Sequence, residues 1–248
     1  MHTLIYEGKI EPDVVPLTLD YRPRIKRQEI EGGPTAEFAV TVFVGRVRVH
    51  VTADIEVSEQ LATDLYFPAW DVARTFVEAA GFIRAIPYTV NLDRVIFPDG
   101  ETKQFAFGDR SLADTHDFSD GDLEALSDIS LIDLKCGLAM SDVLMTLGRA
   151  HYSPIACGRV ADSIARLIAP AASRTAQWEK LRAALHVDEK FVRSLSEVSK
   201  SSRHGDRVEV DATTNRETAH RAWTLFGRYL RYRLNGELDP GHYPLLKG

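Results

Sequence analysis

Hydrophobic and polar residues alternate through much of the first hundred positions, as they do in β-strands that bury one face. The clearest case is the stretch AEFAVTVFVGRVRVHVTADIEV at 36–57, where valines recur at alternating positions on each side of Gly45. In its second half, the polar residues Arg46, Arg48 and His50 fall on the face opposite the valines. The pattern predicts a long strand or a hairpin that turns near Gly45.

A second strand pair follows a helical segment. YTVNLDRVIFPDGETKQFAF places a Pro-Asp-Gly turn, centred on Asp99, between two apolar runs, which is typical of a hairpin. Before it, apolar residues repeat at helical spacing from Pro68, and Gly81 is predicted to end that helix. These elements predict a sheet with a packed helix.

The stretch GDRSLADTHDFSDGDL is acidic, rich in turn residues and poor in apolar ones. Its aspartates do not have the spacing of an EF-hand calcium loop, so no metal site is expected here. The composition favours a connector between domains. We place the linker at residues 113–118.

Helical spacing of apolar residues dominates the rest of the chain. Five helices are predicted from the following start signals and apolar positions: Ser141, Ser153 with Pro154, the stripe of Trp178, Leu181 and Leu185, Asp188, and a capping box of Thr214 with Glu217. Short connections between them predict an antiparallel bundle. The expected fold is α+β: an N-terminal α+β domain at 1–112 and an all-α bundle at 119–248.

Charge is unevenly distributed along the chain, whose net charge is -6. Residues 149–248 hold 17 Lys and Arg against 11 Asp and Glu, so the preceding part is strongly acidic. A basic part beside an acidic part is typical either of a polyanion-binding face or of two domains that attract each other.

Several classes of site and location find no support in the residues. No apolar run approaches the ~20 residues of a membrane-spanning helix, and we expect a soluble, cytoplasmic protein. Cys136 and Cys157 have no metal-ligand or disulfide spacing and are predicted to be small buried residues. Motifs of serine hydrolases, phosphate loops, zinc proteases and dinucleotide-binding folds are absent, so we expect no cofactor and no metal.

The order of the C-terminal segments resembles a known type of bacterial protein. HYSPIACGRVADSIARLI, WEKLRAALHVDEKFVRSLSEVSKSSRHGD and ETAHRAWTLFGRYLRY resemble the helical half of uncharacterised proteins with a HEPN-like bundle, in which a helix ends in a basic R-H-G before one closing helix. FPAWDVARTFVEAAGF and VNLDRVIFPDG are similar to the N-terminal half of such proteins, some of which carry a methylamine-utilisation accessory label. The resemblance implies a HEPN-like bundle that pairs as a homodimer, association with RNA, and a role in bacterial defence or stress response.

HEPN ribonucleases carry Arg-x(4-6)-His, in which histidine moves a proton and arginine holds the phosphate. The matching histidine here is His204, but residues 197–199, where the arginine should lie, are Glu, Val and Ser. Arg110 and His116 match the spacing formally, which chance alone is expected to produce. Catalysis is therefore not expected, and a metal-independent ribonuclease built on His204 and Arg203 is the weakest hypothesis.

The remaining candidate site is a basic edge, for which two interpretations stay open. Either it binds RNA or another polyanion, or its basic residues stabilise the carboxyl end of a helix that Gly205 terminates. The candidate binding residues around Arg203 and His204 are Lys200, Arg207, Arg216, His220, Arg221 and an exposed pair, Tyr229 and Tyr232. The leading hypothesis is a non-catalytic nucleic-acid-associated module, and the alternative is an interaction protein whose bundle docks an acidic partner, its own N-terminal domain or a second copy.

Overall fold

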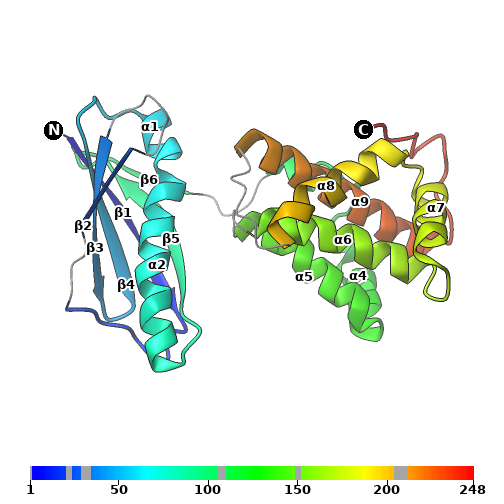
Figure 1. The fold of residues 1–248 in the computed structure, drawn as a ribbon, viewed down its shortest axis with the longest axis horizontal. Coiled ribbons are helices and arrows are strands. Elements are labelled where there is room, and N and C mark those ends of the chain that lie inside the picture. The colour runs from blue at the N-terminus through cyan, green and yellow to red at the C-terminus, as the bar shows by residue number, and fades with distance from the viewer. Residues whose placement is uncertain (1, 21–23, 29–34, 106–109, 149–151, 204–211) are drawn as a thin grey trace. The chain divides into compact units, whose positions relative to one another are not determined.

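The computed structural model (Figure 1) describes residues 2–20, 24–28, 35–105, 110–148, 152–203 and 212–248. The chain divides into two compact units, Met1–Phe107 and Gly108–Gly248, called the N-terminal unit and the C-terminal unit below. Strands with packed helices form the first unit, and helices form the second. The architecture is α+β, as the hydrophobic pattern predicts.

The described strands of the N-terminal unit form one antiparallel six-stranded sheet in the order β2-β3-β4-β1-β5-β6. The strands are β1 (His2–Glu11), β2 (Arg24–Gln28), β3 (Thr35–Phe43), β4 (Arg46–Ala53), β5 (Thr89–Ile96) and β6 (Thr102–Gln104). The helices of this unit are α1 (Glu59–Asp64) and α2 (Tyr66–Arg84). Because β1 lies between β4 and β5, its side chains have cross-strand neighbours on both sides.

One face of the sheet holds the core of the N-terminal unit, and α2 runs along it (Figure 1). Tyr6 is fully buried there, and its hydroxyl donates a hydrogen bond to the Ala62 carbonyl at 2.7 Å. The Trp70 indole N–H donates to the Val90 carbonyl at 3.0 Å, which fixes α2 on β5. Residues that alternate with the core positions point to the opposite side, called the open face below.

At Gly45, where the pattern allowed a long strand or a hairpin, the chain forms a hairpin, and the second predicted hairpin is confirmed. β3 and β4 are joined by Val44 and Gly45, whose φ angles of 46° and 71° are those of a tight two-residue turn. In the second hairpin, the Phe97 N–H donates to the Glu101 carbonyl at 2.8 Å and Gly100 has a φ of 88°. Glycine tolerates such angles, but the β-branched Val44 does not do so readily.

Replacing Val44 with asparagine is therefore expected to stabilise the N-terminal unit. The left-handed conformation costs a non-glycine residue about 1–2 kcal/mol, and asparagine relieves part of that cost. We expect a gain of about 0.5–1 kcal/mol in the free energy of unfolding, measured by urea denaturation. The control is Val44→Thr, which keeps the branched Cβ and should give no gain.

Helix α2 is longer than predicted. It runs to Arg84, and the left-handed residue that ends it is Ala85, with a φ of 55°. Gly81 lies inside the helix, where a Cβ would come within 2.6 Å of the Ile86 carbonyl oxygen. The glycine thus permits close packing of the chain that follows α2, and the prediction that it ends the helix is wrong.

The C-terminal unit is built around one helix, α6. Its described elements are α3 (Arg110–Ala113), η1 (Asp120–Asp122), α4 (Leu123–Ile132), α5 (Leu134–Gly148), α6 (Ser153–Ile168), α7 (Arg174–Leu185), α8 (Glu189–Arg203) and α9 (Ala212–Asn235). Helices α5, α7, α8 and α9 pack against α6. Cys136 and Cys157 are both buried in this core, as predicted, and burial raises the pKa of the Cys157 thiol to about 12.

Some predicted helix starts are wrong and one is confirmed. Ser141 and Thr214 lie inside α5 and α9; the Ser141 hydroxyl donates back to the Gly137 carbonyl at 3.2 Å instead of capping a helix. A hydroxyl can bond a carbonyl one turn earlier as readily as it can cap, so sequence alone does not separate the two roles. At the start of α8, the Asp188 carboxylate accepts from the Phe191 N–H at 2.7 Å, as predicted.

Candidate nucleic-acid interface

The predicted basic edge lies only partly within the described residues. Lys200 is exposed near the end of α8, and Arg203 is the last residue of that helix. His204, Arg207 and the side chain of Arg203 lie outside the part of the chain that the structure describes. The candidate catalytic pair therefore stays a prediction.

On the closing helix α9, Arg216 and His220 are exposed, whereas Arg221 has a structural role. The Arg221 guanidinium donates to the Ser194 hydroxyl at 2.7 Å and lies 5.7 Å from the centre of the Phe191 ring. These contacts tie α9 to α8.

The expected exposed tyrosine pair is not present. Tyr229 is 0% exposed, and Tyr232 is half-buried against the bundle core. Arg233 donates to the Tyr229 hydroxyl at 2.9 Å. The prediction was wrong because α9 has helices on several sides and buries a wider face than a surface helix does. Neither tyrosine offers α9 an open stacking surface.

The segment predicted to be a linker belongs to the C-terminal unit and is held on α9 by Arg231. Its guanidinium donates to the carboxylates of Asp117 at 2.8 Å and Asp122 at 3.3 Å, and it lies 4.0 Å from the Phe118 ring centre. The Tyr243 hydroxyl donates to Asp117 at 2.9 Å. This arrangement, called the Arg231 cluster below, joins the linker, α9 and the C-terminal segment.

The Arg231 cluster borders a pocket of about 400 Å³ that Asn235, Asp239 and His242 also line. Partial burial would raise the pKa of Asp117, but hydrogen bonds from Arg231 and Tyr243 lower it below its usual value. Asp117 therefore stays ionised and hydrogen-bonded to Arg231 and Tyr243. The cluster is better suited to holding the chain together than to moving protons.

A basic surface that the sequence pattern does not predict lies on the open face of the sheet. Strand register places Lys9 opposite Arg46 and places Glu7 opposite both Arg48 and Arg94. Farther along, Arg24 is opposite Ala39, and Lys26 is opposite Glu37. Paired residues point to the same side of a sheet. The exposed cations of this surface, called the basic face below, are Lys9, Arg24, Lys26, Arg46, Arg48 and Arg94.

Charge is thereby segregated within the N-terminal unit. Residues 1–107 contain 16 Asp and Glu against 11 Lys and Arg, so the unit as a whole is acidic. On the open face of the described strands, the acidic residues beside the cations are few: Glu7, Glu37 and, at the end of β1, Glu11. The basic face therefore offers positive charge on a unit that otherwise repels polyanions.

Two further residues shape the chemistry of the basic face. Burial lowers the pKa of His50, and Arg48 lowers it further while Glu7 opposes the change, so the ring is neutral near pH 7. Phe43 lies opposite Arg46 and is 71% exposed. An exposed aromatic ring beside cations is the combination that binds an unpaired base and its phosphate.

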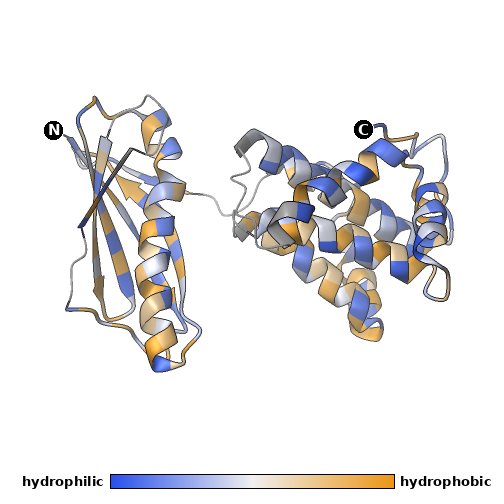
Figure 2. Cartoon of the chain, in the orientation of Figure 1, coloured by the Kyte–Doolittle hydropathy of each residue, from blue (hydrophilic) through white to orange (hydrophobic). Residues whose placement is uncertain are grey.

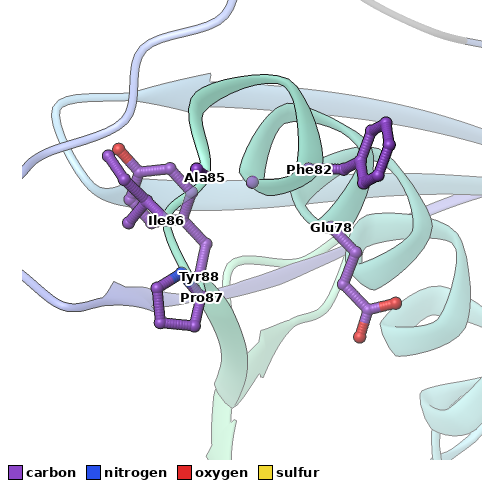
Figure 3. A pocket seen from close by; sticks show the side chains of 7 residues that line it. Glu78, Phe82, Ala85, Ile86, Pro87 and Tyr88 are labelled. Atoms are coloured by element: carbon purple, nitrogen blue, oxygen red, sulfur yellow. The ribbon is translucent and has the colours of Figure 1, made fainter.

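Figure 3 shows another pocket, at the end of α2. Glu78 and Phe82 project from the last turns of the helix, and Ile86 and Pro87 lie across from them, around a pocket of about 350 Å³. The lining is mainly apolar with one carboxylate, and no set of polar groups converges on the space. The pocket gives no indication of a ligand class.

Exposed apolar side chains gather where α4 meets α5 in the C-terminal unit, and Figure 2 shows the hydrophobic colouring there. Leu131, Ile132, Leu134 and Leu138 are 82%, 85%, 72% and 56% exposed. Apolar side chains clustered on a surface mark contact sites more often than isolated ones do. This group is called the α4–α5 apolar surface below.

Fold and surfaces define a protein with an antiparallel sheet domain that carries a basic open face, followed by an all-α domain. Two family profiles match the chain: "Domain of unknown function (DUF8168) N-terminal domain" at residues 4–105 and "Domain of unknown function (DUF8168) C-terminal domain" at residues 123–234. The chain belongs to this two-domain DUF8168 family. No curated protein and no solved structure matches it.

The described residues contain neither a membrane-spanning helix nor a group of metal ligands. No described helix combines the length and apolar character needed to cross a bilayer. Within the same residues, no group of three or more His, Cys, Asp and Glu side chains is arranged to hold a metal ion.

Proposed function

We propose that this protein is a non-catalytic nucleic-acid-binding protein, and that the basic face of the N-terminal unit holds single strands. The observation that carries the proposal is the charge segregation: among the described side chains, six exposed cations share one face of a unit with a net negative charge. Phosphate contacts supply most of the sequence-independent affinity for nucleic acids.

A single strand suits the basic face better than a duplex does. The face is a sheet surface with no protruding helix from the described part of this unit, and Phe43 offers a ring on which a base can stack. In a duplex the bases are already stacked and unavailable, whereas unpaired bases can splay onto an aromatic side chain. RNA is the proposed natural ligand, in keeping with the resemblance of the bundle to HEPN-like proteins.

The C-terminal unit is proposed to support this function as a HEPN-like bundle in a bacterial defence or stress response. On this unit, the exposed side chains Lys200, Arg216 and His220 would be further candidates for contacts with RNA. A ribonuclease activity at His204 remains an alternative that cleavage assays with His204→Ala address.

The proposal is tested by titrating the full chain into a labelled single-stranded RNA at several salt concentrations. Binding through phosphates predicts an affinity that falls steeply with salt, with a log–log slope of about -0.7 for each phosphate contacted on a single strand. Absence of saturable binding at low salt, or an affinity indifferent to salt, would refute the proposal.

A second candidate function is assembly into a homodimer, and the α4–α5 apolar surface favours it. The closing helix α9 is less suitable as an interface, because apolar side chains of that helix, such as Leu225 and Tyr229, are buried within the unit. An apolar surface can meet its own copy about a two-fold axis, since the same residues then face one another.

Replacing Ile132 with glutamate is expected to convert a dimer into a monomer, because it would bury unpaired carboxylates in the interface. Light scattering coupled to size exclusion gives the mass directly. Phe82→Glu is the matched control, since Phe82 is 89% exposed on α2 and lies in the other unit. A monomeric wild-type chain, or an unchanged dimer in Ile132→Glu, would argue against this surface.

A further inference from the structure

At the centre of the basic face, a single carboxylate binds two arginines from neighbouring strands. Glu7 on β1 accepts from Arg48 Nε on β4 at 2.5 Å through Oε1. Its Oε2 accepts from Arg94 on β5, with Nε at 2.8 Å and Nη2 at 2.6 Å. Each carboxylate oxygen thus fixes one guanidinium group.

Exposure differs sharply within this trio. The Glu7 side chain is 8% exposed, whereas those of Arg48 and Arg94 are 62% and 47% exposed. The carboxylate therefore lies beneath the two guanidinium groups, which face solvent. An arginine has five N–H donors, and the contacts to Glu7 use only some of them, so outward-facing donors remain on both side chains.

We infer that Arg48 and Arg94 form a phosphate clamp that Glu7 holds in position. The inference rests on the proposed function and names the part of the basic face that grips one phosphate group of the strand. Guanidinium groups bind phosphate oxygens through bidentate pairs of hydrogen bonds. A guanidinium group that is already held in position loses less side-chain entropy on binding than a free one does. Glu7 is a positioning residue and does not itself contact the phosphate.

Position in the sheet supports the clamp. Adjacent strands lie about 4.8 Å apart, so guanidinium groups from β4 and β5 can reach one phosphate that sits over β1. On either side of the trio, Thr41 is paired with Arg48 and Gln104 with Arg94. Lys9 and Arg46 form the next pair on the same face, two residues along each strand, and can hold a neighbouring phosphate.

Substitution of Glu7 separates positioning from simple charge. Glu7→Gln keeps the size of the side chain and makes the net charge of the protein more positive by one. If charge alone governed binding, the variant would bind single-stranded RNA more tightly. The clamp predicts the opposite. An amide has only one acceptor oxygen, so the glutamine can hold only one of the two arginines in position. We expect the variant to bind single-stranded RNA about fivefold more weakly, or weaker still.

Glu37→Gln is the matched control. Glu37 also lies on the open face and pairs with Arg24 at 3.6 Å. It is half-exposed, and among the described side chains it holds no second cation. The same charge change there should leave the affinity unchanged or slightly raise it. Circular dichroism and thermal unfolding of each variant establish that the sheet is intact.

A second pair of substitutions covers the case in which Glu7→Gln fails to fold. The double variant Arg48→Lys with Arg94→Lys keeps both positive charges but removes both guanidinium groups. We expect it to bind single-stranded RNA at least fivefold more weakly. Wild-type affinity in either folded variant would overturn the clamp and leave the proposed function standing. Failure of the wild-type chain to bind RNA would overturn both.

Discussion

Charge reversal at Lys26 and Arg46 is expected to weaken the binding of single-stranded RNA about 10- to 100-fold at low salt. The two side chains lie on different strands of the basic face, and both are exposed. Within the described residues neither makes an ion pair, so their replacement by glutamate should leave the fold unchanged. The slope of affinity against salt should become shallower as well, because fewer phosphates are neutralised.

The control for this experiment is Arg84→Glu. Arg84 is exposed at the end of α2, on the side of the sheet opposite the basic face. It changes the net charge as each single reversal does. The double variant changes the net charge twice as much, so a loss of log affinity in Arg84→Glu half as large as in the double variant would show that only total charge matters. Retention of binding in Lys26→Glu with Arg46→Glu would remove the basic face from the account.

Replacing Arg231 with alanine should lower the stability of the C-terminal unit by about 2–3 kcal/mol, because hydrogen bonds to charged partners are lost together. Only 17% of the Arg231 side chain is exposed, and it joins Asp117, Asp122 and the Phe118 ring. For a unit of this size we expect a fall in Tm of about 5–10 °C. Arg231→Lys keeps the positive charge but loses the guanidinium group, so its stability should lie between those of Arg231→Ala and the wild type.

The stability contributed by the Arg231 cluster should depend on pH in one direction. Since the folded pKa of Asp117 lies below its usual value, its contribution is complete near neutral pH and is lost as the pH falls through that folded pKa. The difference in Tm between wild type and Arg231→Ala should therefore narrow in acid, below about pH 4. A difference that is absent at pH 7, or that grows on acidification, would contradict the assigned pairing.

Local patterns predicted much of the fold correctly. Alternation of valines and polar residues on each side of Gly45 located β3 and β4, and a Pro-Asp-Gly turn located the second hairpin. Apolar residues recur every two positions in strands and about every 3.6 positions in helices, and either spacing can be recognised within a short segment. The fold class follows from these two spacings. Helix boundaries were less accurate, as Gly81 and Ser141 show, since glycine and serine serve more than one role in a helix.

The candidate surfaces could not be read in the same way, because they depend on strand register and helix environment. Arg46 and Arg48 were visible as outward-facing residues, but nothing local shows that β1 lies beside β4 and brings Glu7 between Arg48 and Arg94. Tyr229 looked exposed because its burial depends on how many helices surround α9.

Cross-linking of the full chain to a photoreactive single-stranded RNA, followed by mass spectrometry, tests the central claim most directly. The account predicts cross-links on the open face of the sheet, foremost at Phe43 and the neighbouring residues of β1 and β4, and their loss in Lys26→Glu with Arg46→Glu. Cross-links confined to the C-terminal unit, or unchanged in that variant, would contradict it.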